Sequence, residues 1–254
     1  MIGSLRSEWL KLRSVRSNLF LMAAIVVVGV GLGTLISAVV PATNGRRGDP
    51  SPLAEPFDRL AIALVGLNLC LLLFGVLGVQ IIGQEYRFNT IRATFAATPR
   101  RLRVVVAKLV VLMATTGVVA AVTLGLALGI NGAILSGRGY GLDLSIDGAG
   151  RYLLGTWLLA FGYALVGFAV GMILRQPIGG IILVLAWPIV VENLIVGFLK
   201  TSAGSWMPYN AGSQLLVRTP DADLLGPWAG FAYFIAFGAV LAVIGAVLVN
   251  RRDA

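Results

Sequence analysis

Three polar side chains interrupt the long apolar stretches of this sequence, and their chemistry depends on whether they meet. Glu192 and Asn193 follow the apolar run that begins at Pro177, and Asn68 lies inside an earlier run. An ionisable side chain near the centre of a membrane-spanning helix costs about 2.5–3.5 kcal/mol on insertion scales, so it needs a role. Counted along helices, Glu192 and Asn68 fall at similar depth in the outer part of a membrane. Two hypotheses stay open: a polar patch beside an outer gate or exit path, or a buried hydrogen-bonded pair joining two helices.

The histidine, cysteine and acidic residue content of the chain gives little support to catalysis or metal binding. The chain has no histidine, and Cys70 is its only cysteine, which excludes an intramolecular disulfide, a histidine ligand set and a histidine base. With a single acid inside the apolar stretches, the chain also lacks a convincing catalytic set for an intramembrane enzyme. We therefore expect no catalytic, cofactor-binding or metal-binding residue.

A nucleotide site is also missing from the sequence. No stretch matches the phosphate-binding pattern G-x-x-x-x-G-K-S/T, and none of the three lysines follows a glycine-rich loop. The chain is therefore not expected to hydrolyse ATP by itself. Energy for any transport has to come from a partner or from an ion gradient.

Residues 1–17 combine an apolar stripe with basic side chains. At about 100° per residue, the stripe lies on one narrow helical face, with the basic residues outside it; it includes Leu5, Trp9 and Leu12. Such a helix lies on the inner leaflet, with the ring buried and the cations facing anionic head groups. The alternative is an ordinary positively charged flank of the first span.

A second apolar stripe lies between two of the long apolar runs, in residues 84–103. Asn89 is a plausible N-cap for a helix over residues 90–97, which should stop before Pro99. Three side chains share one face at helical spacing: Phe88, Ile91 and Phe95. Such an apolar stripe is expected to be buried against another surface, either that of a partner protein or that of the other spans of the same chain.

The elements that position these residues are long apolar helices. A helix crosses a hydrocarbon core of about 30 Å with roughly 20 apolar residues. Six stretches are long enough, at residues 19–40, 61–83, 105–135, 152–174, 177–199 and 228–249. The sequence therefore predicts an all-α integral membrane protein, with an interfacial helix (1–17), a six-span domain (18–254) and a short cytosolic coupling helix.

The charge distribution orients these spans. The N-terminal tail, the 84–108 loop, Arg175 and the C-terminal tail together hold 13 Lys and Arg but only three acids, whereas the other loops hold seven Lys and Arg. Loops rich in Lys and Arg stay in the cytoplasm. Both termini are therefore expected on the cytoplasmic side, and the basic residues face a membrane rather than nucleic acid.

Three segments together carry a resemblance to a known family. The chain resembles the membrane subunits of export-type ABC transporters, the type-2 ABC permeases, in its N-terminal helix, its inner loop and the segment before its last span. The matching residues are 7–14, 83–87, 89–92, 97–101 with Lys108, and 207–212. Asn89 is often glycine in that family, a mild departure because asparagine also tolerates left-handed geometry.

This resemblance implies a working assembly. Two such permeases pair, as a homodimer or a related heterodimer, and each docks on a cytosolic ATPase subunit that holds ATP-Mg, so the complex contains two ATPase copies. The excess of Arg over Lys, 17 to 3, indicates a bacterial genome, and we expect the protein in a bacterial cell membrane. The third outer loop is implied to form small helices that dip back toward the membrane. The implied ATPase-coupling residues are Glu85, Phe88, Asn89, Thr90, Ile91, Arg92 and Phe95.

The sequence thus predicts a non-enzymatic permease subunit of an ATP-driven exporter. The alternative is a gradient-driven secondary transporter or channel, against which the scarcity of charges in the spans and the lack of an internal repeat both count. Lipid, drug, peptide and polysaccharide remain open as substrates, because the spans show no distinctive ligand chemistry. Three glycine pairs, Gly29/Gly33, Gly125/Gly129 and Gly167/Gly171, allow close helix approach.

Overall fold

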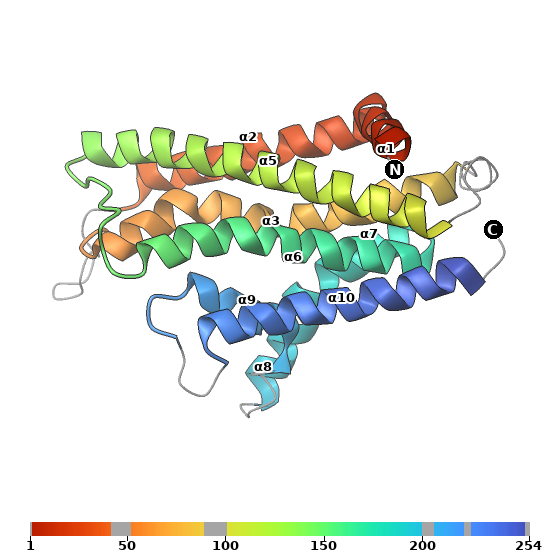
Figure 1. The fold of residues 1–254 in the computed structure, drawn as a ribbon. Coiled ribbons are helices and arrows are strands. Elements are labelled where there is room, and N and C mark those ends of the chain that lie inside the picture. Colours follow the sequence, from red (N-terminus) through yellow and green to blue (C-terminus); the bar gives the residue numbers. More distant parts are fainter. Residues whose placement is uncertain (1, 42–51, 89–100, 200–205, 221–224, 252–254) are drawn as a thin grey trace.

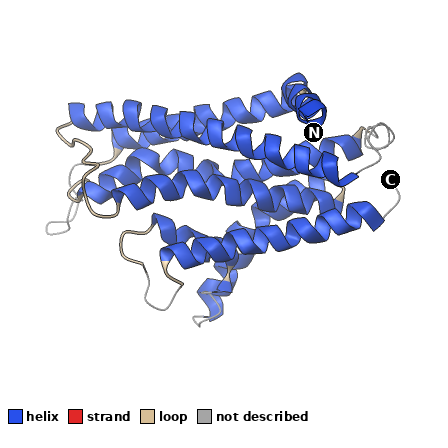
Figure 2. Ribbon diagram, in the orientation of Figure 1, coloured by secondary structure: helices blue, strands red, loops and turns tan. Residues whose placement is uncertain are grey.

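The computed structural model describes residues 2–41, 52–88, 101–199, 206–220 and 225–251. These residues form a bundle of long helices (Figure 1), and the described ranges contain no strand (Figure 2). The elements in chain order are α1 (Ile2–Ser14), α2 (Arg16–Val39), α3 (Pro56–Arg87), α5 (Arg101–Gly137), α6 (Ala149–Leu174), α7 (Pro177–Ala186), the π-helix η1 (Trp187–Glu192), α8 (Asn193–Leu199), α9 (Pro208–Ser213), the 3-10 helix η3 (Gln214–Leu216) and α10 (Pro227–Arg251).

Six candidate membrane spans are present within the described residues, and this confirms the all-α integral membrane class. They are α2, α3, α5, α6, the stretch Pro177–Ile195 and α10. Several helices continue past the apolar stretches that mark them in the sequence. For example, α3 already begins at Pro56, because proline suits the first turn of a helix, where its missing N–H has no partner to lose.

The helix α1 has a different direction from the spans. In Figure 1 it is seen nearly end-on, whereas the long helices run across the view. Val15, with an extended backbone, separates α1 from α2 and makes this corner. The ends of α1 and α10 lie at the same end of the bundle, together with the end of α3 and the start of α5 (Figure 1).

The centre of the bundle is the pair α3 and α6. In each, 61% of the most apolar window is buried, against 17% in α2 and 22% in α10, so the latter two helices lie at the periphery. Glycines allow the central helices to approach closely. A Cβ at Gly167 of α6 would overlap the backbone of Gly75 in α3, and one at Gly66 of α3 would overlap Gly29 in α2. Two of the three glycine pairs thus pack within the chain, whereas a Cβ at Gly125 or Gly129 would meet no atom of the described residues within 4 Å.

The fifth span is interrupted, which the continuous apolar stretch 177–199 did not predict. It consists of α7, the π-helix η1 and α8. Pro188 lies in η1 and has no N–H, so the regular helical hydrogen-bond ladder cannot pass through it. π-helical turns of this kind are rare and often occur at functional sites. The interruption places Glu192 at the end of η1, directly before α8.

The segment before the last span folds back on the bundle. Its short helix α9 and the turn η3 pack against α10, and η3 also contacts α6. Tyr209 and Leu215 of this segment are buried, and Gly230 of α10 lies directly against the backbone of Ala211. The segment therefore is part of the packed protein rather than a free loop.

Candidate functional site

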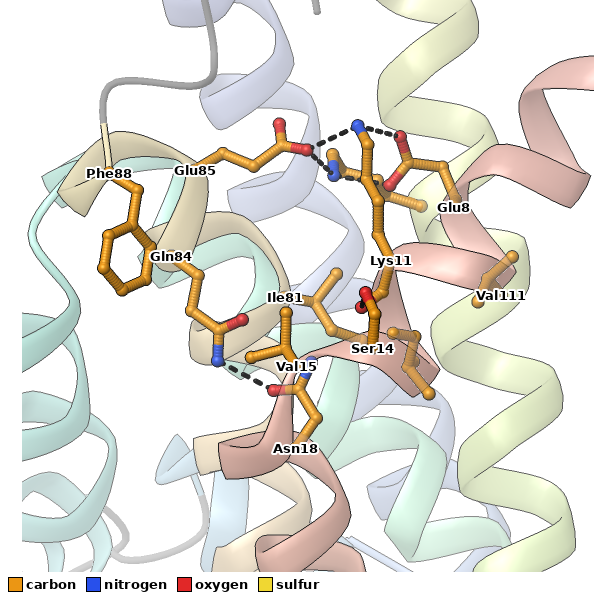
Figure 3. A pocket seen from close by; sticks show the side chains of 12 residues that line it. Glu8, Lys11, Ser14, Val15, Asn18, Ile81, Gln84, Glu85, Phe88 and Val111 are labelled. Carbon is orange, nitrogen blue, oxygen red and sulfur yellow. Dashed lines mark hydrogen bonds and ion pairs between the residues drawn. The ribbon is translucent and has the colours of Figure 1, made fainter.

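Four charged side chains form a closed ring at the bundle end that holds α1 (Figure 3). Lys108 Nζ of α5 donates to Glu8 Oε2 of α1 at 2.6 Å and to Glu85 Oε1 of α3 at 2.8 Å. Lys11 Nζ of α1 donates to Glu8 Oε1 at 2.9 Å and to Glu85 Oε1 at 2.7 Å. Positive and negative charges alternate around this charge ring, so every neighbouring pair is attractive. The ring joins three helices.

The charge ring is mostly withdrawn from solvent. The side chain of Lys108 is 2% exposed and those of Glu8 and Glu85 are 7% and 9% exposed, whereas Lys11 is 39% exposed. Partial burial lowers the pKa of Lys11, but hydrogen bonds with Glu85 and Glu8 and the attraction of their charges together outweigh burial and leave that pKa above its ordinary value. Removing one partner of a buried ion pair strands the other charge, which typically costs about 3–5 kcal/mol. The ring therefore resists opening.

The position of each ring residue follows from local structure. Glu8 and Lys11 are three residues apart in α1, a spacing that brings side chains to one helical face. Glu85 lies in the last turns of α3 and Lys108 near the start of α5. Residues 89–100 connect these two helices, so the ring lies at the base of the connection that contains the predicted coupling helix.

A cavity of about 290 Å³ lies beside the ring, between α1, α3 and α5 (Figure 3). Gln84 forms part of its polar wall and donates to Asn18 Oδ1 at 2.8 Å and to Ser17 Oγ at 2.9 Å. These bonds tie the end of α3 to the start of α2. The apolar part of the lining comes from Leu12, Val15, Ile81, Phe88 and Val111.

Two of the predicted coupling residues are described. Glu85 belongs to the charge ring, and Phe88 lies at the rim of the cavity with 62% of its surface exposed. The Arg87 guanidinium lies 5.6 Å from the centroid of the Phe88 ring. The other predicted coupling residues, Asn89, Thr90, Ile91, Arg92 and Phe95, lie outside the described residues.

The predicted stripe of α1 divides between two environments. Leu12 is 4% exposed and belongs to the main core, and Leu5 packs half-buried against that core. Trp9 is 43% exposed, and the Arg13 guanidinium lies 5.9 Å from its ring. Leu5 and Leu12 therefore attach α1 to the bundle, whereas the Trp9 side chain remains partly exposed on the surface of α1.

Glu192 holds the segment before the last span, through its helix α9, to the fifth span. Its Oε1 accepts a hydrogen bond from the backbone N–H of Tyr209 at 3.2 Å, and its Oε2 accepts one from Asn210 at 2.9 Å. The Trp187 indole donates to Oε1 at 3.1 Å. Tyr209 and Asn210 lie in the first turn of α9, whose N–H groups have no partner within the helix. Glu192 is thus an N-terminal cap supplied from another helix.

Asn68, Glu192 and Asn193 do not hydrogen-bond to one another, so the hypothesis of a hydrogen-bonded pair between the second and fifth spans is wrong, and the polar patch beside a gate stays a prediction. Asn68 donates to the Tyr152 hydroxyl of α6 at 2.6 Å and accepts a hydrogen bond from Thr156 at 3.3 Å. Asn193 is exposed and donates to the carbonyls of Pro188 and Ile189 in the preceding π-helix η1, each at 3.0 Å. Each polar side chain is satisfied by a different group: hydroxyls of α6 for Asn68, the first N–H groups of α9 for Glu192 and carbonyls of η1 for Asn193. Asn68 therefore joins the second and fourth spans rather than the second and fifth.

Sequence reasoning did not identify the charge ring as a unit. The sequence predicts a coupling role for Glu85, but it presents Glu8, Lys11 and Lys108 only as parts of longer motifs. A signal was present: only three acids fall in the segments assigned to the inner side, and two of them are Glu8 and Glu85. Acids are scarce where positive charge dominates, so a lysine partner for each was a reasonable expectation.

The part of the chain that the structure describes holds no cluster of metal-binding side chains. No group of three or more His, Cys, Asp or Glu side chains among these residues could hold a metal ion. The arrangement at the charge ring is one of opposite charges that neutralise each other, which suits holding helices together rather than proton transfer.

Comparisons with known proteins identify a family for most of the chain. The family model for the ABC-2 family transporter protein matches residues 4–191, which is more than half of the chain. The matched part contains all four residues of the charge ring and ends one residue before Glu192. A comparison with curated proteins gives no match.

Proposed function

We propose, because the chain belongs to the ABC-2 family of transporter proteins, that this ABC transporter permease works as the membrane subunit of an ATP-driven exporter. Its energy comes from a separate ATPase subunit, and it moves its substrate out across a bacterial cell membrane. The observation that carries this proposal is the charge ring, which fastens α1 to the two helix ends that flank the predicted coupling helix.

The proposed orientation puts both termini and the charge ring in the cytoplasm. The excess of Lys and Arg in the segments at this end supports it, since such residues are retained on the cytoplasmic side. The described ends of α1 and α10 lie together at one end of the bundle (Figure 1). A cytosolic partner then meets the connection between α3 and α5.

In the proposed assembly, two permease chains and two ATPase subunits form one transporter, and ATP-Mg is bound by the ATPase. The contact surface on this chain consists of residues 84–103. Phe88 supports this assignment, because a large exposed aromatic side chain at a cytoplasmic surface is typical of a binding site. Ile91 and Phe95 continue its stripe in the sequence.

A gradient-driven transporter is the competing function. Its proton-driven form needs an ionisable group that takes up and releases the proton within the membrane. Glu192 is the acid of the fifth span, and both of its oxygens accept hydrogen bonds from the backbone of α9. A carboxylate held in this way suits a fixed cap better than a carrier of protons.

The test is purification of the tagged chain from membranes of its native host in mild detergent. We expect an ATPase subunit with a phosphate-binding motif to copurify, and the complex to hydrolyse ATP. Recovery of the chain alone, folded and without ATP hydrolysis, would contradict the proposed function.

A further inference from the structure

We infer that the charge ring is a lock that makes α1, the start of α2, the end of α3 and the start of α5 move as one body, and that Lys108 is its principal positioning residue. This inference rests on the proposed function for its role, because the body carries the connection to which the ATPase is proposed to bind. Its geometry stands by itself.

The contacts of Lys108 are the first argument. One ammonium group joins carboxylates from two different helices, Glu8 of α1 and Glu85 of α3, and its own stem belongs to a third helix. With 2% of its side chain exposed, water has little access to replace either bond. A relative shift of any of the three helices therefore breaks at least one buried ion pair.

The closed ring is the second argument. Lys11 bridges the same two carboxylates from the more exposed side, at 2.9 Å and 2.7 Å. Glu8 and Glu85 thus each have two lysine partners, and opening one contact leaves the other in place. Such redundancy keeps α1 attached during fluctuations that would separate a single ion pair.

The third argument is a separate link to α2. Gln84, adjacent to Glu85 in α3, binds Asn18 and Ser17 at the start of α2. The end of α3 is therefore held both by α1 through charges and by α2 through amide and hydroxyl groups. Motion of the α3–α5 connection is then passed to α1 and α2, rather than absorbed by local bending.

The test measures whether α1 and α5 keep a fixed distance. In a Cys70→Ala background, spin labels are placed at Leu10 of α1 and Val106 of α5, which are 57% and 41% exposed. The permease is studied in phosphatidylethanolamine and phosphatidylglycerol vesicles, alone and with its copurified ATPase. For the unmodified ring we expect one narrow distance, equal with and without ATP-Mg. A distance that changes when ATP-Mg is added would overturn the lock.

Two variants separate a lock from general stability. Lys108→Met should broaden the distance, whereas Lys11→Met, at the exposed side of the ring, should broaden it less. Lys108→Met combined with Glu8→Gln leaves Lys11 and Glu85 as one intact pair, so folding should recover while the distance stays broad. A folded double variant with the narrow distance of the parent would also overturn the lock.

The role of the lock is tested by measuring whether ATP-Mg binding to the ATPase changes a distance between the membrane-spanning helices. ATP-Mg should change the distance between labels on α2 and α10 in the parent complex, and the lock predicts that the Lys108→Met, Glu8→Gln variant loses this response while ATPase copurification persists. A full response in that variant would contradict the role. If no ATPase copurified, the proposed function would fail, and the distance in the permease alone would still test the lock.

Discussion

Glu8 and Lys108 lie 100 residues apart in the sequence, and their side-chain charges meet at 2.6 Å. This ion pair joins the first helix of the chain to the start of the third span, beside the connection proposed to bind the ATPase. It is buried, so its loss is expected to affect stability far more than the loss of a surface ion pair.

Lys108→Met should therefore lower the free energy of unfolding by about 3–5 kcal/mol, because it leaves two buried carboxylates with only Lys11 between them. Lys11→Met should have a smaller effect, since Lys11 is 39% exposed and water already screens its ion pairs with Glu8 and Glu85. Thermal unfolding of the detergent-solubilised variants measures both. Equal losses for the two lysines would contradict the ring energetics.

The stability contributed by Lys11 should depend on pH at the alkaline end. Its pKa is raised in the folded protein, so its contribution is fully present below its unfolded value of 10.5 and is lost as pH rises through the raised value. Melting temperatures of the parent should show this loss above about pH 10.5, and Lys11→Met should lack that component. If the melting temperature of Lys11→Met fell above about pH 10.5 as much as that of the parent, the predicted contribution of Lys11 would be contradicted.

Glu192 should matter as a cap for α9 rather than as a proton carrier. Glu192→Gln keeps one oxygen that can accept a hydrogen bond from α9, whereas Glu192→Leu removes both carboxylate acceptors from the start of α9, at a cost of about 1–3 kcal/mol for a buried group. We expect Leu to lower the melting temperature more than Gln does. A Gln variant that folds normally but loses all function would favour proton-linked transport instead.

The topology is tested by a reporter fused after Ala254. The distribution of 13 basic residues at one side and seven at the other predicts reporter activity only in the cytoplasm. Activity on the outer side of the membrane would rule out an arrangement with both termini inside.

Most of the fold could be predicted from the sequence, for physical reasons. Long apolar stretches can only be spans, so the six candidate helices were predictable from hydrophobicity alone. The interruption of the fifth span at η1 was harder to predict, because Pro188 is compatible with a kinked helix as well as with a π-helical turn.

Side-chain partners were harder to predict than spans. Depth along a helix can be estimated for Asn68 and Glu192, but depth does not say which face each side chain occupies. Glu192 instead caps α9, and the resemblance of residues 207–212 to a known family does not say which side chain pairs with them. Lys108 presents the same difficulty, since its partners come from two helices whose rotation only tertiary packing determines.

The most direct test of the central claim is whether the ATPase depends on the stripe of the inner loop. Burial of one large apolar side chain contributes about 1.5–3 kcal/mol, so Ile91→Ala combined with Phe95→Ala should weaken ATPase binding by several powers of ten at most. The matched control is Leu144→Ala with Val217→Ala, since both side chains are exposed apolar residues of other loops. We predict that the Ile91, Phe95 variant inserts and folds normally but loses the copurifying ATPase and its ATP hydrolysis, while the control keeps both. Normal copurification and normal ATP hydrolysis with the Ile91, Phe95 variant would contradict the account.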